Sequence, residues 1–284
     1  MKKSFAVAVG VFGLFLSAGV SKAADFAEGA KQPFQFDLGW AWDSYDTVAR
    51  MDYTRGGIVT AGTSVDFEKL LNIPVMDSHF RGVGSWRFSN VSYVQLGFES
   101  ISREGQRALT EQITWGDTTF ALGGQLDGKF DSNETYLGYR FDAFRADNVR
   151  VGLTIGFSYW NIDSSLTGQG SVTKPDGSVV SGSFVKAFSL NAPVPVIGIA
   201  TEGAISKDFT FGFYARGLFV RLTDISAGEL QGGLNVKWFA TCNFGVSLGV
   251  DVTTINVKKY VKDDQIFSAS YTFAGPRLSV LAAF

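Results

Sequence analysis

The feature that most constrains this chain is a strict alternation of apolar and polar residues over long segments. One such segment carries its apolar residues at Val151, Leu153, Ile155, Phe157 and Tyr159, with glycine, threonine and serine between them. Residues 230–238 and 244–252 repeat the pattern. A β-strand sorts alternate side chains onto opposite faces, whereas a helix would scatter them around its axis. The sequence therefore predicts long β-strands with one apolar face.

The apolar face of these strands meets either a second sheet or lipid, and three observations favour lipid. The strands run well beyond the usual length of about five or six residues, and their other face carries glycine, small polar residues and single charges, as a barrel interior does. Aromatic residues also gather at the predicted strand ends, as in interfacial girdles. They are Trp86, Phe88, Phe141, Phe144, Phe209, Trp238 and Phe239 toward one side, and Tyr159, Trp160 and Tyr260 toward the other.

The predicted fold class is therefore all-β, an antiparallel transmembrane up-and-down β-barrel of about 10–12 strands. A soluble secreted β-sandwich is the alternative fold.

Both ends of the chain carry export signals. Lys2 and Lys3 precede an apolar run from residue 5 to residue 20, and Ser21-Lys22-Ala23 has small residues where signal peptidase reads them. We expect residues 1–23 to be a cleaved signal peptide and residues 24–284 to be the barrel domain. A membrane anchor helix is the weaker alternative, because the apolar run is short for a full span.

The last seven residues alternate back from Phe284 and resemble the C-terminal signal by which the barrel assembly machinery recognises its substrates. Together, the two signals predict a location in the outer membrane of a Gram-negative bacterium.

Ten strands can be placed on the pattern, at 35–53, 77–88, 91–104, 125–142, 148–163, 180–205, 208–222, 227–239, 243–257 and 265–284. Short connections then fall on the periplasmic side, and longer ones near 54–76, 105–124 and 164–179 fall outside. Residues 62–68 are either loop or one of two further strands that would make twelve. Pro193, Pro195 and Pro276 predict bends or bulges.

Composition excludes several classes of function. One cysteine excludes a disulfide framework, and one histidine excludes sites built from several histidines. A net charge of -2 argues against a dedicated nucleic-acid binder. We therefore expect no cofactor, no metal site and no nucleic-acid partner. The expected partners are outer-membrane lipids, lipopolysaccharide and, through Phe284, the barrel assembly machinery, and we expect a monomer.

Several short motifs, taken in order, look like those of a group of uncharacterised bacterial outer-membrane β-barrel proteins, small barrels that are OmpA-like or porin-like in the broad sense. The motifs lie at residues 46–52, 62–68, 86–88, 115–120, 192–196 and 274–276. Lys69 departs from the group, whose members tend to carry acidic residues after the Asp-Phe-Glu at 66–68. The resemblance implies fold and compartment, and it supplies no catalytic residues.

His79 is the one imidazole that could act in catalysis. On a strand it shares the inward face with Asp77, Arg81 and Ser85. A hydrolase would need it beside a carboxylate or a serine, and Asp77 or an inward Glu99 could be its partner. The simpler interpretation is an interior histidine hydrogen-bonded to its neighbours, and we expect no enzymatic activity.

Charged residues on the inward face are more informative. They are Arg81, Arg87, Glu99, Glu134, Arg140, Arg150, Glu202, Arg216, Lys237 and Asp251. Both signs are present, so in a narrow barrel these charges pair and fill the lumen, while in a wider one they line a water path.

Three hypotheses for function follow. The favoured one is an integral barrel with a structural or surface role in the cell envelope, with its lumen filled by paired charges. The second is a small porin-like channel for polar solutes. The third is an envelope hydrolase that uses His79.

Overall fold

The computed structural model describes residues 25–55, 58–121, 123–173, 178–221, 225–261 and 265–284. The predicted signal peptide, residues 1–23, lies outside the described residues. The long strands are β1 (Phe34–Arg55), β4 (Met76–Arg87), β5 (Ser92–Ala108), β8 (Gln125–Arg145), β9 (Val149–Thr173), β10 (Val179–Ala204), β11 (Phe209–Arg221), β12 (Ile225–Phe239), β13 (Phe244–Val261) and β14 (Gln265–Ala283). The short elements are α2 (Glu28–Lys31), β2 (Ile58–Thr60), β3 (Val65–Asp66), α3 (Phe67–Leu70), β6 (Ile113–Trp115) and β7 (Thr118–Phe120).

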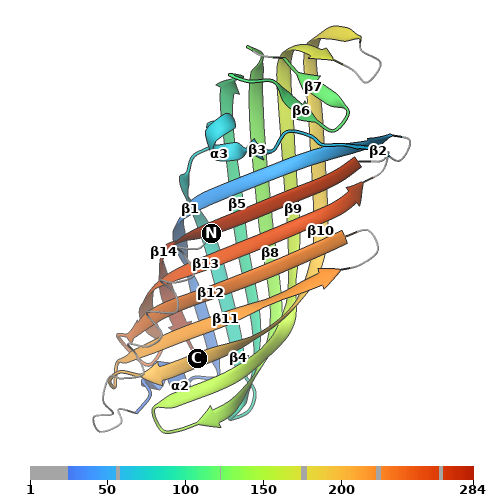
Figure 1. Ribbon diagram of the computed structural model, residues 1–284. Helices are drawn as coiled ribbons and strands as arrows, with labels where there is room; N and C mark the ends of the chain where they lie inside the picture. The colour runs from blue at the N-terminus through green and yellow to red at the C-terminus, as the bar shows by residue number, and fades with distance from the viewer. Residues whose placement is uncertain (1–24, 56–57, 122, 174–177, 222–224, 262–264) are drawn as a thin grey trace.

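In the described part of the chain, the ten long strands form a closed antiparallel barrel (Figure 1). Each pairs with its neighbour in sequence, and β1 closes the ring on β14, with Gln35 opposite Ala283. The all-β up-and-down barrel predicted from the alternation is confirmed. Residues 62–68 hold only β3 and the start of α3, so they add no strand to the wall.

The outer surface of the barrel changes from apolar to polar part of the way up. On β5 the outward residues Leu96 and Phe98 are followed by Ser100, whose hydroxyl donates to Asn133 on β8 at 2.6 Å. On β9 the apolar outward series ends at Tyr159. We call the apolar zone the belt, and the outward face of β5, β8, β9 and β10 above it the collar.

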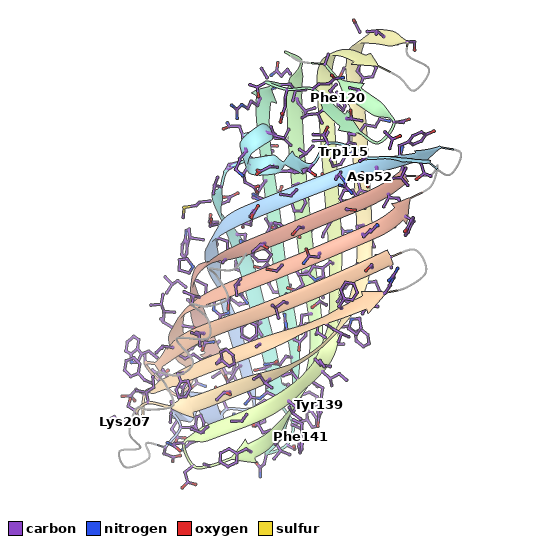
Figure 2. The ribbon with its side chains drawn as sticks, in the orientation of Figure 1. Asp52, Trp115, Phe120, Tyr139, Phe141 and Lys207 are labelled. Atoms are coloured by element: carbon purple, nitrogen blue, oxygen red, sulfur yellow. The ribbon has the colours of Figure 1, made fainter. Side chains whose placement is uncertain are left out.

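The belt is what a lipid bilayer requires of a barrel exterior, because lipid cannot hydrogen-bond to polar side chains. Figure 2 shows Tyr139 and Phe141 pointing outward near the lower end of the belt, the end that holds α2. No helix among the described residues is long and apolar enough to cross a membrane.

The collar is tall because β9 continues from Tyr159 to Thr173 and β10 begins at Val179. That part of β9 is about 45 Å of strand at about 3.3 Å per residue. The outer loop predicted near 164–179 is therefore wrong over most of its length. Hydrogen bonds between strands, such as Asn161 to Asn191 at 2.8 Å, hold this polar extension together without an apolar outer face.

Three of the aromatic residues assigned to girdles lie elsewhere. Trp160 has the opposite phase to Tyr159 and is 1% exposed inside the barrel. Phe239 is buried against α2, where the Gly29 backbone approaches its ring. Tyr260 is exposed, but it lies near the upper end of β13, well above the belt.

The prolines of β10 produce no register shift. β10 pairs with β9 along residues 179–203, but it pairs with β11 only from Ile197 to Ala204. Pro193 and Pro195 lie on the stretch whose second edge pairs with no strand of the described residues, so a missing N–H there removes no ladder hydrogen bond. Near Pro276 the ladder between β1 and β14 is interrupted, and it resumes in the same register.

The barrel interior is apolar at both ends. The upper cluster fills the barrel beneath α3 and the β6–β7 hairpin, and it includes Trp160, Phe188, Phe267 and Tyr271. The lower plug is formed by α2 and the segment before it, with Phe26 and Ala30 packed against Phe239 and Leu281. Polar and charged side chains fill the space between these two seals.

Candidate functional site

The structure places the ten charged side chains assigned to the lumen inside the barrel, buried or half-buried. They are Arg81, Arg87, Glu99, Glu134, Arg140, Arg150, Glu202, Arg216, Lys237 and Asp251. They divide into a group near the lower plug and a group at mid-height.

The lower group is rich in cations. Arg140 Nε lies 2.7 Å from Asp142 Oδ1, and Glu202 lies 3.6 Å from Arg150 and 3.9 Å from Lys237. Arg87 donates to the carbonyl of Ala30 in α2 at 2.5 Å. Among these described residues, four cations face two carboxylates, and Arg87 ties the charged group to the lower plug.

The lower plug is also fixed from its own side. The Arg150 guanidinium lies 4.0 Å from the centre of the Phe26 ring, which is a cation–π contact. At the outer surface of this segment, the hydrogen bond from the Lys31 ammonium lowers the pKa of the Asp25 carboxyl.

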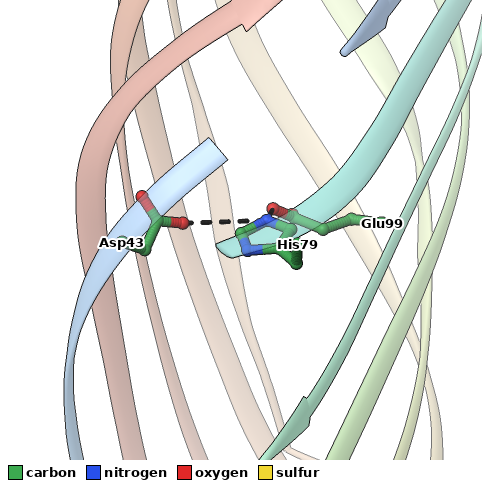
Figure 3. Close-up of side chains that lie close together, drawn as sticks. All are labelled: Asp43, His79 and Glu99. Atoms are coloured by element: carbon green, nitrogen blue, oxygen red, sulfur yellow. Dashed lines mark hydrogen bonds and ion pairs between the residues drawn. The ribbon is translucent and has the colours of Figure 1, made fainter. Parts of the chain in front are cut away.

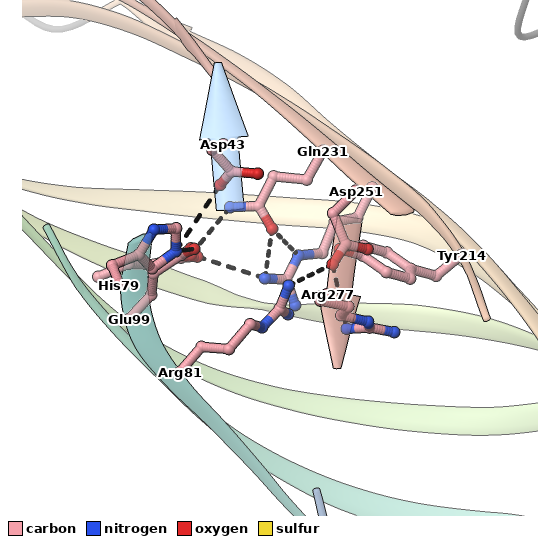
Figure 4. A network of polar contacts seen from close by, with 10 residues as sticks. Asp43, His79, Arg81, Glu99, Tyr214, Gln231, Asp251 and Arg277 are labelled. Carbon is pink, nitrogen blue, oxygen red and sulfur yellow. Dashed lines mark hydrogen bonds and ion pairs between the residues drawn. The ribbon is translucent and has the colours of Figure 1, made fainter. Parts of the chain in front are cut away.

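The mid-height group is rich in carboxylates (Figure 4). Asp251 pairs with Arg81 and, at 3.1 Å, with Arg277. Glu134 lies 3.3 Å from Arg216 and accepts a hydrogen bond from Gln231 at 3.0 Å.

Glu229 completes this group on its upper side. It accepts a hydrogen bond from Trp160 Nε1 at 2.7 Å, so an indole of the upper cluster holds a carboxylate of the mid-height group.

His79 lies between two carboxylates of this group (Figure 3). Its Nε2 contacts Glu99 and lies 3.7 Å from Asp43 Oδ2, while Tyr45 Oη lies 3.0 Å from its Nδ1. β1, β4 and β5 bring these residues together, because Ala41 pairs with His79 and Arg81 pairs with Glu99. Of the two partners suggested for His79, Glu99 contacts it, whereas Asp77 accepts from the Ser78 backbone instead.

Sequence reasoning missed several members of this interior. Asp43, Asp142, Glu229 and Arg277 were not assigned to the lumen, although each is at most 4% exposed and lies inside. The signal was available for Asp43, which has the same strand phase as the inward Ala41 and Tyr45.

A cavity of about 170 Å³ runs between the two charged groups. Its lining includes Asp43, Arg81, Glu134, Arg140, Glu202 and Asp251. The upper cluster lies above this polar space and the lower plug below it, and we call the space the chamber.

The sequence matches no protein-family model and no curated protein. Among solved structures, it is similar to the outer membrane protease OmpT of Escherichia coli, with a TM-score of 0.52 and 12% identity over 89% of this chain and 97% of that one. The toluene transporter TodX of Pseudomonas putida aligns with a TM-score of 0.35 and 8% identity, over 89% of this chain and 90% of that one. Ail of Yersinia pestis aligns at 0.25 and 11%, over 86% and 98%.

The likeness to OmpT concerns the fold alone at this level of identity. The chain has the fold of bacterial outer-membrane β-barrel proteins. The location in the outer membrane that the sequence predicts agrees with this fold and with the apolar belt, which is the surface such a barrel presents to lipid.

Proposed function

We propose that this protein is a non-conducting outer-membrane barrel that acts as a structural or surface component of the cell envelope. The observation that carries the proposal is the arrangement of the interior, with an apolar seal at each end and ion pairs across the space between the seals. As part of this proposal, residues 1–23 are a signal peptide and the mature barrel is a monomer. The resemblance of residues 46–52 and 62–68 to a group of small outer-membrane barrels supports it.

The two seals lie in series, so either one alone blocks the flow of ions. In the upper cluster the Phe188 and Phe267 rings stack with their centroids 3.6 Å apart. Moving a hydrated ion through such packed apolar side chains costs far more than thermal energy.

The porin-like channel remains the second candidate because of the polar chamber at mid-height. It would require both seals to move. The ion pairs that cross the chamber, such as Arg81 with Asp251, also occupy the cross-section that a solute would need.

An envelope hydrolase receives less support. The hydroxyl in contact with His79 belongs to Tyr45, and His79 is 6% exposed beneath the upper cluster. A lipid or protein substrate would have to displace that cluster to reach the imidazole.

Planar-bilayer conductance tests the proposal. The refolded mature chain should show no discrete current steps, and neither should a variant lacking residues 25–32 or the variant Phe188→Ala/Phe267→Ala. Combining the deletion with both alanine substitutions should open both seals and produce steps.

Heat-modifiable mobility in detergent, measured on each sample, verifies that the barrel is folded. Steps from the intact folded barrel would overturn the proposal in favour of the channel. Silence from the combined variant would show that the paired charges alone block the lumen.

A further inference from the structure

The cluster of Asp43, His79 and Glu99 combines two carboxylates with one imidazole inside the barrel. Their donor atoms all lie within 4.8 Å of one another. We propose that these three side chains bind a divalent transition-metal cation, best matched by Zn²⁺. This inference goes beyond the proposed envelope role and does not depend on whether the lumen conducts.

The donor set favours zinc over the hard alkaline-earth cations. Zn²⁺ accepts imidazole nitrogen and carboxylate oxygen together in four-coordinate sites, whereas Mg²⁺ and Ca²⁺ favour oxygen ligands alone. Three protein donors leave a fourth position for water.

The histidine ring is already oriented for this purpose. Tyr45 Oη lies 3.0 Å from Nδ1 and can accept a hydrogen bond from it, and Nε2, which now contacts Glu99, would become the ligand when the ion displaces its proton. Metal-binding histidines commonly have their second nitrogen held by a hydrogen bond in this way. Glu99 would move outward from its present contact with Nε2 to admit the ion.

An unsatisfied polar atom provides independent support. Asp43 Oδ1 is buried and has no hydrogen-bond partner among the described residues, and the Asp43 side chain is 4% exposed. Oδ1 lies beside Gly275 of β14 while Oδ2 faces His79, so the burial of this carboxylate is only partly compensated, and a cation held by Oδ2 would offset that cost.

The charges nearest the cluster also favour a cation. At mid-height the carboxylates are Asp43, Glu99, Glu134, Glu229 and Asp251, and the guanidinium groups are Arg81, Arg216 and Arg277. Arg81 and Arg277 are both engaged by Asp251. Carboxylates therefore outnumber guanidinium groups around the cluster, which favours a cation over an anion at this height.

The chamber provides room beside the site. Asp43 and Glu99 both line the cavity of about 170 Å³, which exceeds the roughly 30 Å³ that one water molecule occupies in the liquid. Water can therefore complete the coordination shell from that side.

Zinc binding by the refolded mature barrel tests the proposal. After EDTA treatment and dialysis against Zn²⁺, the folded barrel should retain one zinc per chain by elemental analysis. X-ray absorption at the zinc edge should show one imidazole with oxygen ligands. Asp43→Asn and His79→Gln should abolish retention, and Tyr45→Phe should weaken affinity by about 10- to 100-fold, as for other residues that orient a ligand.

Asp77→Asn is the matched control, because Asp77 lies two positions from His79 on the same face of β4 and contacts Ser78 instead. It should bind zinc as the unchanged barrel does. If a substituted barrel does not fold, the absorption spectrum of the unchanged protein still decides.

A folded barrel that retains no zinc, or a spectrum without imidazole, would overturn the site. The cluster would then be a histidine hydrogen-bonded between two carboxylates. Equal zinc retention by His79→Gln would overturn it as well.

Discussion

Arg103 carries its charge into the apolar upper part of the barrel. Its side chain is fully buried, lies 2.8 Å from Glu68 Oε1, donates to Thr47 Oγ1 at 2.6 Å, and stacks 3.9 Å from the Tyr45 ring centre. Glu68 belongs to α3 and also accepts from the Thr47 backbone at 2.9 Å. One guanidinium therefore joins an outer loop to two strands of the wall.

Arg103→Ala should be strongly destabilising, because it leaves the Glu68 carboxylate buried without its partner. Breaking a buried pair of this kind costs about 3–5 kcal/mol. Urea unfolding of the refolded barrel in detergent, followed by tryptophan fluorescence, measures the effect.

Lys129→Ala is the control for this experiment. It breaks a pair with Asp131 at 2.8 Å in which the lysine side chain is 51% exposed, and it should cost less than about 1 kcal/mol. Equal midpoints for the two variants would show that Arg103 contributes no more than a surface charge.

β10 passes along its length from two neighbouring strands to one. Below Ile197 in the barrel wall it is paired on both edges, and above that point β9 is its one strand partner. An open edge of this length would attract other strands, and prolines without N–H groups protect it.

Pro193→Ala/Pro195→Ala should therefore leave the unfolding free energy within about 1 kcal/mol, because no ladder hydrogen bond changes. Thr201→Pro should weaken the barrel sharply, since Thr201 has the same phase as the two prolines and pairs with both Val151 and Phe213. Unfolding midpoints and heat-modifiable mobility compare the variants. Equal losses of unfolding free energy in the double proline variant and in Thr201→Pro would contradict the interpretation that the two prolines lie on an open strand edge.

The strands themselves were predictable because their two faces meet different surroundings. Where the outer face meets lipid, alternation is strong, and the ten predicted strands match the long strands closely. Above the belt the outward face of β9 is polar and its inward face places Leu166 between Ser164 and Gly168, so the pattern fades and predicts a loop over residues 164–173.

Contacts between strands far apart in sequence were less predictable. The strand phase of Trp160 indicates an inward side chain. The prediction of a girdle residue rested instead on its position at a strand end. That Asp43 meets His79 depends on the register between β1 and β4, which no local pattern fixes. The docking of α2 under the barrel is likewise a tertiary contact of a four-residue helix.

The whole molecule is a barrel taller than its apolar belt. Its collar carries polar residues such as Asn133 outward, while Leu137, four residues further down β8 on the same face, is 54% exposed within the belt. In a cell, the collar should face the medium and the belt should face lipid.

Cysteine labelling on intact cells tests this orientation. In a Cys242→Ser background, Asn133→Cys should react with a membrane-impermeant maleimide, and Leu137→Cys should not. The native Cys242 is exposed at the lower end and should react only after the outer membrane is permeabilised. Labelling of Cys242 in place of Asn133→Cys would mean the opposite orientation.

The interior charges are separated into two zones, with cations in excess near the lower plug and carboxylates in excess at mid-height. The boundary between them is a junction between two zones of fixed charge. Mobile cations enter the carboxylate zone freely and are repelled by the arginines, and anions behave in the opposite way. A lumen opened at both seals would therefore rectify. Its current would be larger when the collar side is positive, because that polarity drives both kinds of ion into the junction, and smaller when the reverse polarity depletes it.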